Sequence, residues 1–304
     1  MFVTANRHRR TNGARWGLEP ICRVLQVSPA SVRSALRRPL APRHLADEAL
    51  KTKVRRIFDE NYQVYGCRKI RAVLAREQLN VDKDRVARLM RELGIQGATR
   101  ARRRFTTRPD PSHSRAPDRV KRDFTATGPN RLWVSDFTYC STWAGMAYVA
   151  FVVDVYSRMI VGWHIETHMR TDLVMHALEQ AIWRRDTLLA GLVAHSDAGS
   201  QYTSIRYTDR LAEIGALPSI GTVGDSYDNA MAESTIGLYK SELVWPKGPW
   251  RSIEQLELAT LVYIEWFNHR RLHGELDLNT PVEIEEQYYR QPRPETPAAT
   301  NPRT

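Results

Sequence analysis

Three carboxylates in the C-terminal half of the chain stand where an acidic side chain needs an explanation. Asp136 interrupts the apolar run LWVSDFTYC, Asp197 ends another short apolar run just before Gly199, and Glu233 lies among small residues in DNAMAESTIGLYKSEL. A carboxylate in an apolar strand is disfavoured unless it is paired, hydrogen-bonded or bound to a metal. Carboxylates that converge from two strands and a helix would form an oxygen-only site, which suits Mg²⁺ or Mn²⁺ and not zinc.

Each acid also has an ordinary structural interpretation when it is taken alone. Asp136 could accept hydrogen bonds at a strand end, Asp197 could form a turn, and Glu233 could face solvent. For Glu233 alone the structural interpretation is the better one, and for each Asp the two are evenly matched. The catalytic hypothesis therefore depends on the joint arrangement of the three residues.

The segments that must position these acids alternate between strand and helix patterns. Strands are predicted at 132–140, 145–155, 159–165, 192–196 and 217–220, and helices at 171–185, 205–214, 227–243 and 252–268. The first three strands are close enough in sequence to form an antiparallel meander. This order predicts a mixed sheet covered by helices, an α/β domain with its chemistry at strand ends.

The charge of the 304-residue chain is divided unevenly between its two halves. The net charge is +11, but residues 1–130 hold 30 Lys or Arg and 12 Asp or Glu, a net +18, so the remainder carries −7. An Arg-rich composition can follow from codon usage, but codon usage does not explain the asymmetry. A basic front half on a mildly acidic back half indicates a nucleic-acid-binding arm joined to another kind of domain.

The basic half has helical patterns. Residues 19–38 form two short amphipathic stretches separated by Ser28-Pro29, the outline of a helix-turn-helix, although any helical hairpin can look this way. Three more helices are predicted at 48–62, at 68–78 and after an Asp82 cap, and Gly94 is expected to end the last of them. Arg85, Arg88 and Arg91 would share one face of that helix. They could be solvated surface charge, but the nearby run Arg102, Arg103 and Arg104 favours contact with nucleic-acid phosphates.

Other polar residues of the back half have structural interpretations. Glu242 is expected to be an exposed charge, Asp154 a structural acid with Arg158 as a candidate partner, and His195 either a packed residue or one that orients DNA. His269 and His273 have i, i+4 spacing but no third zinc ligand, and His164 and His168 have no CxxC partner. Five tryptophans are expected in the core: Trp133, Trp143, Trp163, Trp183 and Trp266.

Three motifs together resemble a known family. NRLWVSDFTY, HSDAGSQYTS and SYDNAMAESTIGLYKSEL are similar to the acidic motifs of DDE-type transposases and retroviral integrases, and 35 residues separate Asp197 from Glu233, as in that superfamily. YGCRKIRAVL with RVARLMRELGI, and WFNHRRLHGEL with NTPVE, resemble the helix-turn-helix module and C-terminal end of OrfB-type transposases of the third bacterial insertion-sequence family. The resemblance runs through most of the chain.

The resemblance implies a ribonuclease-H-like catalytic core that cleaves insertion-sequence ends and joins them to target DNA. Asp136, Asp197 and Glu233 would be both the catalytic residues and the ligands of two Mg²⁺ ions, for which Mn²⁺ can substitute. Lys240 matches the family pattern, and because it follows Glu233 by seven residues it would lie on the same helix face and contact DNA. Its other interpretation is an ordinary surface charge.

The expected organisation has five parts. A basic segment with a possible helix-turn-helix (1–44) precedes a helix-turn-helix-like DNA-binding domain (45–104), a linker (105–127), an integrase-type catalytic core (128–291) and a disordered tail (292–304). The expected partners are the terminal inverted repeats, target DNA, further copies of the chain on DNA, and the product of an upstream frame. No membrane partner is expected, because the longest apolar run is far too short to span a bilayer.

Two rival functions share some of these features. A hydrolytic nuclease or ribonuclease H would use the same fold, and a catalytically silent repressor would use only the helical arm. Three widely spaced cysteines form neither a disulfide framework nor a CxxC site, and no signal peptide is visible, so a reduced cytoplasmic setting is expected. The resemblance to bacterial insertion-sequence transposases implies a bacterial cell and association with the nucleoid.

Overall fold

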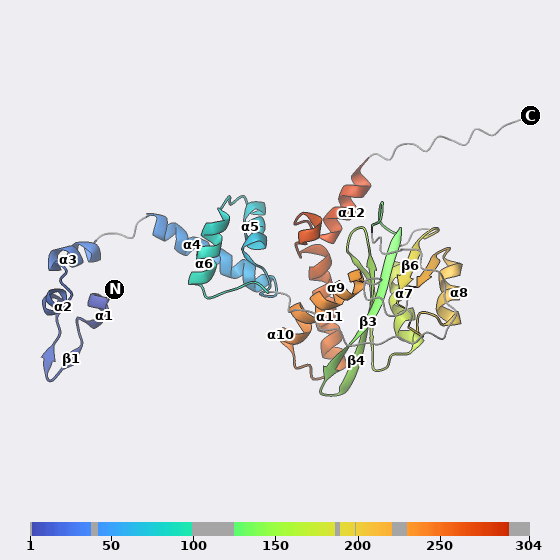
Figure 1. Ribbon diagram of the computed structural model, residues 1–304, viewed down its shortest axis with the longest axis horizontal. Coiled ribbons are helices and arrows are strands. Elements are labelled where there is room, and N and C mark those ends of the chain that lie inside the picture. The colour runs from blue at the N-terminus through green and yellow to red at the C-terminus, as the bar shows by residue number, and fades with distance from the viewer. Residues whose placement is uncertain are drawn as a thin grey trace, which may run out of the picture. The chain divides into compact units, whose positions relative to one another are not determined.

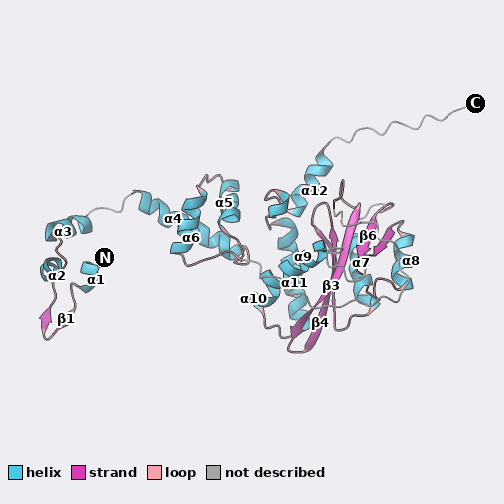
Figure 2. Ribbon diagram, viewed as in Figure 1, coloured by secondary structure: helices cyan, strands magenta, loops and turns pink. Residues whose placement is uncertain are grey.

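The structure is a computed structural model of the chain, and it describes residues 2–37, 42–98, 125–185, 189–197, 199–220 and 230–291. The polypeptide divides into two compact units, Met1–Arg55 and Arg56–Thr304. Figures 1 and 2 show the helical front half and the sheet-containing back half of the chain. The predicted linker and tail fall almost entirely outside the described residues.

The first unit is built from short elements. It contains α1 (Phe2–Asn6), a two-residue hairpin of β1 (Arg10–Thr11) and β2 (Ala14–Arg15), α2 (Leu18–Val24), α3 (Pro29–Arg37) and the first part of α4 (Pro42–Glu60). Its small core is formed by Val3, Ile21 and Cys22, with Val32 of α3 packed against them. Helices α2 and α3 have the predicted helix-turn-helix order, and Arg33 of α3 is ion-paired with Glu19 of α2.

The remaining helices of the front half also agree with the sequence pattern. After α4 come α5 (Cys67–Arg76) and α6 (Lys83–Glu92), whose apolar faces bury Ile70, Leu74, Val86 and Leu89. The predicted cap is confirmed, since the Asp82 carboxylate accepts a hydrogen bond of 2.8 Å from the backbone N–H of Asp84. Gly94 follows α6 with φ of 64°, the left-handed geometry that commonly ends a helix.

The back half contains a five-stranded mixed sheet in the order β5-β4-β3-β6-β7. Strands β3 (Leu132–Thr142), β4 (Gly145–Asp154) and β5 (Ile160–Glu166) form the predicted antiparallel meander. Strands β6 (Val193–Ser196) and β7 (Leu217–Ile220) add in parallel to the other side of β3. This α/β sheet after a helix-turn-helix module confirms the expected ribonuclease-H-like fold class.

Both faces of the sheet are covered by helices, which is why β4 is nearly continuously apolar. Alternate β4 residues Ala150 and Val152 lie in a core shared with α7 (Thr171–Arg185) and α8 (Ile205–Glu213). Phe151, on the opposite face, packs its ring 5.0 Å from that of Tyr239. Helices α9 (Ala230–Tyr239) and α11 (Ile253–His269) cover that second face (Figure 1).

The C-terminal segments depart from the prediction in their details. One helix was expected over 227–243, but α9 ends at Tyr239 and is followed by a π-helical turn, η1 (Lys240–Val244), and by α10 (Trp245–Lys247). A 3₁₀ turn, η2 (Gly274–Leu276), and α12 (Pro281–Arg290), whose start is fixed by a Thr280–Glu283 capping box, were not predicted. No helix within the described ranges is long and apolar enough to cross a membrane.

Candidate active site

Strand register places Asp136 and Asp197 side by side. In the parallel pair β3–β6, Ser135 lies opposite Ser196, so the next residue of each strand is one of the two predicted acids. Asp136 is half-buried within β3, and Asp197 is the first residue after β6. β3 continues to Thr142, so Asp136 lies inside β3 at the level where β6 ends, and the register of the two strands sets it beside Asp197.

The Asp197 carboxylate disfavours ionisation of Asp136. Burial, together with the nearby Asp197 carboxylate, raises the pKa of Asp136 to about 7, although the backbone N–H of Phe137 donates to its Oδ1 at 2.8 Å. Burial likewise raises the pKa of Asp197, against a hydrogen bond from the Gly199 N–H. Two adjacent acids with raised pKa values are typical of a site that is completed by a cation or a proton.

The loop after Asp197 packs closely around this acid and contributes one residue, Tyr202, that the sequence analysis did not assign. A Cβ at position 199 would lie 3.0 Å from Asp197 Oδ1 and 3.1 Å from Gln201 Oε1, so any residue other than glycine would require these two side chains to shift. Tyr202 is buried, and burial and the charges of both Asp136 and Asp197 raise the pKa of its hydroxyl well above the usual value. That hydroxyl forms no hydrogen bond with any described residue. Its signal in the sequence is only its place in HSDAGSQYTS.

Glu233 approaches the same region from α9, which packs on β3 and β4. It is half-buried and lies in the first turn of the helix. Among the described residues, however, the one group of three or more His, Cys, Asp or Glu whose ligand atoms all lie within 4.8 Å of one another is His164, Glu166 and His176. The three predicted acids therefore do not form such a group in the described part of the chain.

Lys240 lies close to Asp136. Its charge acts to lower the pKa of that carboxyl, and its Nζ lies 4.8 Å from the ring centre of Tyr139, an exposed residue of β3. The helix is α-helical up to Tyr239, so Lys240 lies two turns beyond Glu233 as the spacing predicts. A cation at the mouth of a carboxylate site is suited to contact a phosphate.

The predicted DNA-contacting arginines lie in the front half. Arg85 and Arg88 are partly buried on α6, Arg91 is exposed, and Arg88 forms an ion pair of 2.6 Å with Glu92. Arg102, Arg103 and Arg104 lie outside the described residues. Of the α6 arginines, Arg91 is thus the most open to a partner.

Asp154 is structural, as expected, but its main partner differs from the predicted one. It is fully buried and accepts hydrogen bonds from the backbone N–H groups of Asn130 at 2.7 Å and of Tyr156 at 2.9 Å. The guanidinium near it is that of Arg185, at 3.7 Å, which also binds Glu285 of α12 through two hydrogen bonds. Arg158 has a smaller role, because it meets Asp154 through a backbone hydrogen bond.

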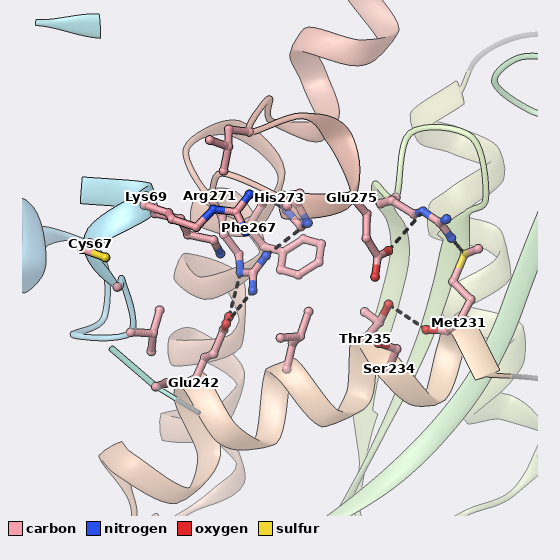
Figure 3. A pocket seen from close by; sticks show the side chains of 18 of the residues that line it. Cys67, Lys69, Met231, Ser234, Thr235, Glu242, Phe267, Arg271, His273 and Glu275 are labelled. Atoms are coloured by element: carbon pink, nitrogen blue, oxygen red, sulfur yellow. Dashed lines mark hydrogen bonds and ion pairs between the residues drawn. The ribbon is translucent and has the colours of Figure 1, made fainter. Parts of the chain in front are cut away.

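The prediction that Glu242 is an exposed charge is wrong. Glu242 is buried in η1 and receives two hydrogen bonds from Arg271, at 2.6 and 2.9 Å, and one from the Tyr263 hydroxyl. This pair borders a pocket of about 710 Å³ between α5, α9 and the segment after α11 (Figure 3). None of the three predicted acids lines the pocket, which lies along Met231, Ser234 and Thr235 of α9.

Histidine and tryptophan predictions are partly corrected. His195 is packed, with Nδ1 2.9 Å from the Ser219 hydroxyl. His269 and His273 are not helical neighbours, because α11 ends at His269 and His273 is buried beside Arg271. Trp133, Trp163 and Trp266 are core residues, but Trp143 and Trp183 are 70% and 82% exposed. Trp143 lies at the turn between β3 and β4, and Trp183 lies on the outer face of α7.

Comparison with known proteins connects this geometry to a family. Residues 45–104 match the model of an HTH-like domain, and residues 126–226 and 215–281 match models of an integrase core domain. The protein assigned as transposase of insertion sequence element IS986/IS6110 in Mycobacterium tuberculosis is 49% identical over 271 residues, covering 88% of this chain and 98% of that protein. The chain belongs to the OrfB-type insertion-sequence transposases.

The chain is also similar to a second transposase and, more distantly, to a solved structure. The transposase for insertion sequence element IS629 of Shigella sonnei is 44% identical over 280 residues, which are 90% of this chain and 93% of that protein. A solved structure, the HTLV-2 integrase catalytic core domain in complex with magnesium, has 18% identity and a TM-score of 0.42, covering 53% of this chain and 99% of that one. Membership implies a transposase that acts on DNA as a polynucleotidyl transferase, with a divalent metal cofactor.

Proposed function

We propose that this transposase cleaves the ends of an insertion sequence and transfers them to target DNA, with Asp136, Asp197 and Glu233 as its catalytic carboxylates. The observation that carries the proposal is the register of β3 and β6, which sets Asp136 next to Asp197 where β6 ends. The effect of the Asp197 charge on the pKa of Asp136 supports the same assignment. Glu233 is included because its helix packs on β3 and because its spacing from Asp197 matches the family motif.

The reaction consists of two phosphoryl transfers that balance without a further reactant. In cleavage, a water oxygen attacks a phosphorus at the element end, the P–O3′ bond breaks, and the departing 3′-oxygen takes up a proton. In joining, that 3′-hydroxyl attacks a target phosphodiester, and a target 3′-oxygen leaves. Little covalent chemistry is asked of the protein, which positions the reactants and offsets negative charge.

The residues present fit a divalent metal. The donors are carboxylate oxygens, the class preferred by Mg²⁺ and Mn²⁺, and the neighbouring Tyr202 hydroxyl forms no hydrogen bond with a described group and is available to a hydrated ion. When bound, Mg²⁺ at Asp136, Asp197 and Glu233 would lower the pKa of the attacking hydroxyl and stabilise the leaving oxygen. Lys240, whose Nζ lies over the exposed Tyr139 ring, would hold an adjacent DNA phosphate.

The decisive experiment compares two Asp→Asn variants in the full chain. D197N should abolish Mg²⁺-dependent cleavage and joining of terminal-repeat DNA, because an amide has lost the charge that binds the metal. D209N is the matched control, since Asp209 is an exposed acid of α8 on the same domain, and it should react like the wild type. Strand transfer at the wild-type rate by D197N would exclude the proposed site.

The same assay separates the rival functions. A hydrolytic nuclease or ribonuclease H would degrade DNA or an RNA–DNA hybrid without joining any ends, whereas a transposase yields joined products. A repressor would bind DNA equally well in wild-type and D197N proteins and would yield no product in either. Chelation of divalent ions by EDTA should stop cleavage and joining, and readdition of Mg²⁺ or Mn²⁺ should restore them.

DNA recognition is assigned to the front half. The net charge of +18 over residues 1–130 and the helix-turn-helix order of α2–α3 support binding of terminal repeats there. Arg85, Arg88, Arg91 and the run Arg102–Arg104 are the proposed phosphate contacts. Assembly of several copies on DNA, and association with the product of an upstream frame, stay predictions that native mass spectrometry of the DNA complex can test.

A further inference from the structure

A second set of ligand-type side chains lies at the edge of the sheet away from Asp197. His164 and Glu166 are on β5, His176 is on α7, and their ligand atoms all lie within 4.8 Å of one another. His164 Nε2 is 3.0 Å from Glu166 Oε1, His176 Nδ1 is 3.1 Å from His164 Nε2, and His176 Nδ1 is 3.7 Å from Glu166 Oε1. We propose that His164, Glu166 and His176 bind a transition-metal ion of the zinc class.

The backbone is built so that these groups meet. Residues 162, 164 and 166 point to one face of β5, because side chains alternate along a strand. At Gly162 a Cβ would collide with the carbonyl oxygen of Ala177 and would lie 2.9 Å from Ala181 Cβ. Glycine therefore lets α7 approach β5 closely, and the next positions on the same strand face, His164 and Glu166, reach His176 just before Ala177.

The spacing of the three atoms suits a small tetrahedral ion. Zinc binds imidazole nitrogen and carboxylate oxygen at about 2.0–2.2 Å, so neighbouring ligands of a tetrahedron lie about 3.3–3.5 Å apart. The observed separations of 3.0, 3.1 and 3.7 Å bracket that value. Small movements of three partly exposed side chains would thus place all of them around one ion.

The donor set differs in kind from that of the catalytic acids. Two imidazoles and one carboxylate favour zinc and its neighbours in the first transition series, whereas Mg²⁺ and Ca²⁺ prefer oxygen ligands. The side chains are 31%, 26% and 50% exposed for His164, Glu166 and His176, so an ion can enter and a water can fill the fourth position. His168 Nε2, 3.9 Å from Glu166 Oε2, is the next imidazole available.

The position of the cluster indicates a structural ion. β5 is an edge strand, separated from β3 by β4, so the cluster and Asp136 are on different strands that are not neighbours. An ion bound there would tie the end of the edge strand to α7, which contributes to the core on that face of the sheet. Metal binding at such a site raises thermal stability by mass action.

The test is a zinc titration of the full chain by calorimetry in excess Mg²⁺, which keeps the oxygen-only site filled. The wild type should bind one equivalent of Zn²⁺ at this cluster, and Co²⁺ in its place should give the visible absorption of a tetrahedral site. H176A should weaken binding at least about 10-fold, and E166Q should also weaken it. D197N should bind zinc like the wild type, so failure of the catalytic proposal would leave this result unchanged.

A matched control and a stability readout make the outcome decisive. His269 is 49% exposed and lies 3.5 Å from Glu265 on α11, and among the described residues this pair belongs to no group of three ligand-type side chains. H269A therefore removes an equivalent imidazole–carboxylate pair, and it should bind zinc like the wild type. Zinc should raise the Tm of the wild type and of H269A but not that of H176A. Equal zinc affinity of H176A and the wild type, or no stoichiometric binding by the wild type, would overturn the proposal and leave a hydrogen-bonded cluster.

Discussion

Two pairs of acids in the same sheet domain have different electrostatic surroundings. Asp154 and Glu285 are buried, and the Arg185 guanidinium lies between them, 3.7 Å from Asp154 and 2.5 Å from Glu285. Asp136 and Asp197 are neighbours where β6 ends, and the Asp197 charge raises the pKa of Asp136. The nearest described cation, Lys240, acts on Asp136 only through space while its Nζ lies over Tyr139.

The difference separates a structural pair from a functional one. A buried acid pair that encloses an arginine has one of its two negative charges offset within the fold, and Asp154 also accepts backbone hydrogen bonds, so the pair is stabilised without an external ligand. An acid pair without an arginine between its members lowers the stability of the fold, because burial and like charge both oppose ionisation. Proteins retain such a loss of stability at sites where a bound ligand compensates for it. Here that ligand would be the implied divalent metal, which serves the phosphate chemistry.

The largest expected effect comes from neutralising Asp136, one acid of the Asp136–Asp197 pair. D136N should reduce strand transfer by about 10⁴-fold or more, because a metal-binding charge is lost from the reacting centre. Its thermal stability should stay the same or rise, since the repulsion from Asp197 disappears. Strand-transfer kinetics and a thermal melt without metal, made on the same preparation, check both expectations. Loss of activity together with a large drop in Tm would instead place Asp136 with the structural acids.

Removing Arg185 from between Asp154 and Glu285 should have the opposite effect, a loss of stability. R185M leaves Asp154 and Glu285 buried without their cation, which should lower the free energy of unfolding by about 3–5 kcal/mol. Urea denaturation measures it. R210M is the control, because Arg210 forms surface ion pairs with Glu179 and Glu213 whose loss should cost under about 1 kcal/mol. Equal destabilisation by the two variants would contradict the assigned role of Arg185.

A third buried ion pair, Glu242–Arg271, sharpens the comparison through pH. Burial first, and then Arg271, lower the pKa of the neighbouring His273 from 6.5 to about 2, and Lys69 and Arg158 act in the same direction. Below pH 6.5 His273 is protonated in the unfolded chain but stays neutral in the folded chain, so the free energy of unfolding falls as the pH falls. Between pH 6.5 and pH 5 the loss should be about 2 kcal/mol.

The His273 expectation is checked by urea denaturation at several pH values. H273N should show a shallower decline of stability below pH 6.5 than the wild type. H269A, which removes a half-exposed histidine from the end of α11, should keep the wild-type slope. The same slope in H273N and the wild type would mean that His273 is protonated in the folded protein, beside Glu242 and Glu275.

Local patterns were sufficient to predict the strands and the two aspartates. An acid inside an apolar run and an acid before a glycine turn are readable from neighbouring residues, and both lie at the predicted strand positions, 136 and 197. The cap at Asp82 and the end of α6 at Gly94 were found in the same way. In each case the interaction spans only a few residues of sequence.

Features that depend on distant residues were missed. Glu242 looked like surface charge because its partner Arg271 is 29 residues away, beyond the end of another helix. His164 was compared with His168 because the two are close in sequence, whereas its nearest imidazole is that of His176, across the β5–α7 contact. Trp143 and Trp183 were assigned to the core by residue type, since exposure is decided by tertiary packing that type alone does not encode.

The smallest expected effect concerns Lys240, the cation close to Asp136. K240M removes the charge and with it the cation–π contact between Nζ and the exposed Tyr139 ring, 4.8 Å away, so the free energy of unfolding should change by less than about 1 kcal/mol. Strand transfer should fall about 10-fold through weaker DNA binding, because one phosphate contact is lost. K247M, at the end of α10, removes the other lysine of this half and should leave the rate unchanged. If K240M lowers the free energy of unfolding as much as R185M does, then Lys240 stabilises its acid pair as Arg185 stabilises the other. The two acid pairs would then be more alike than their geometry indicates.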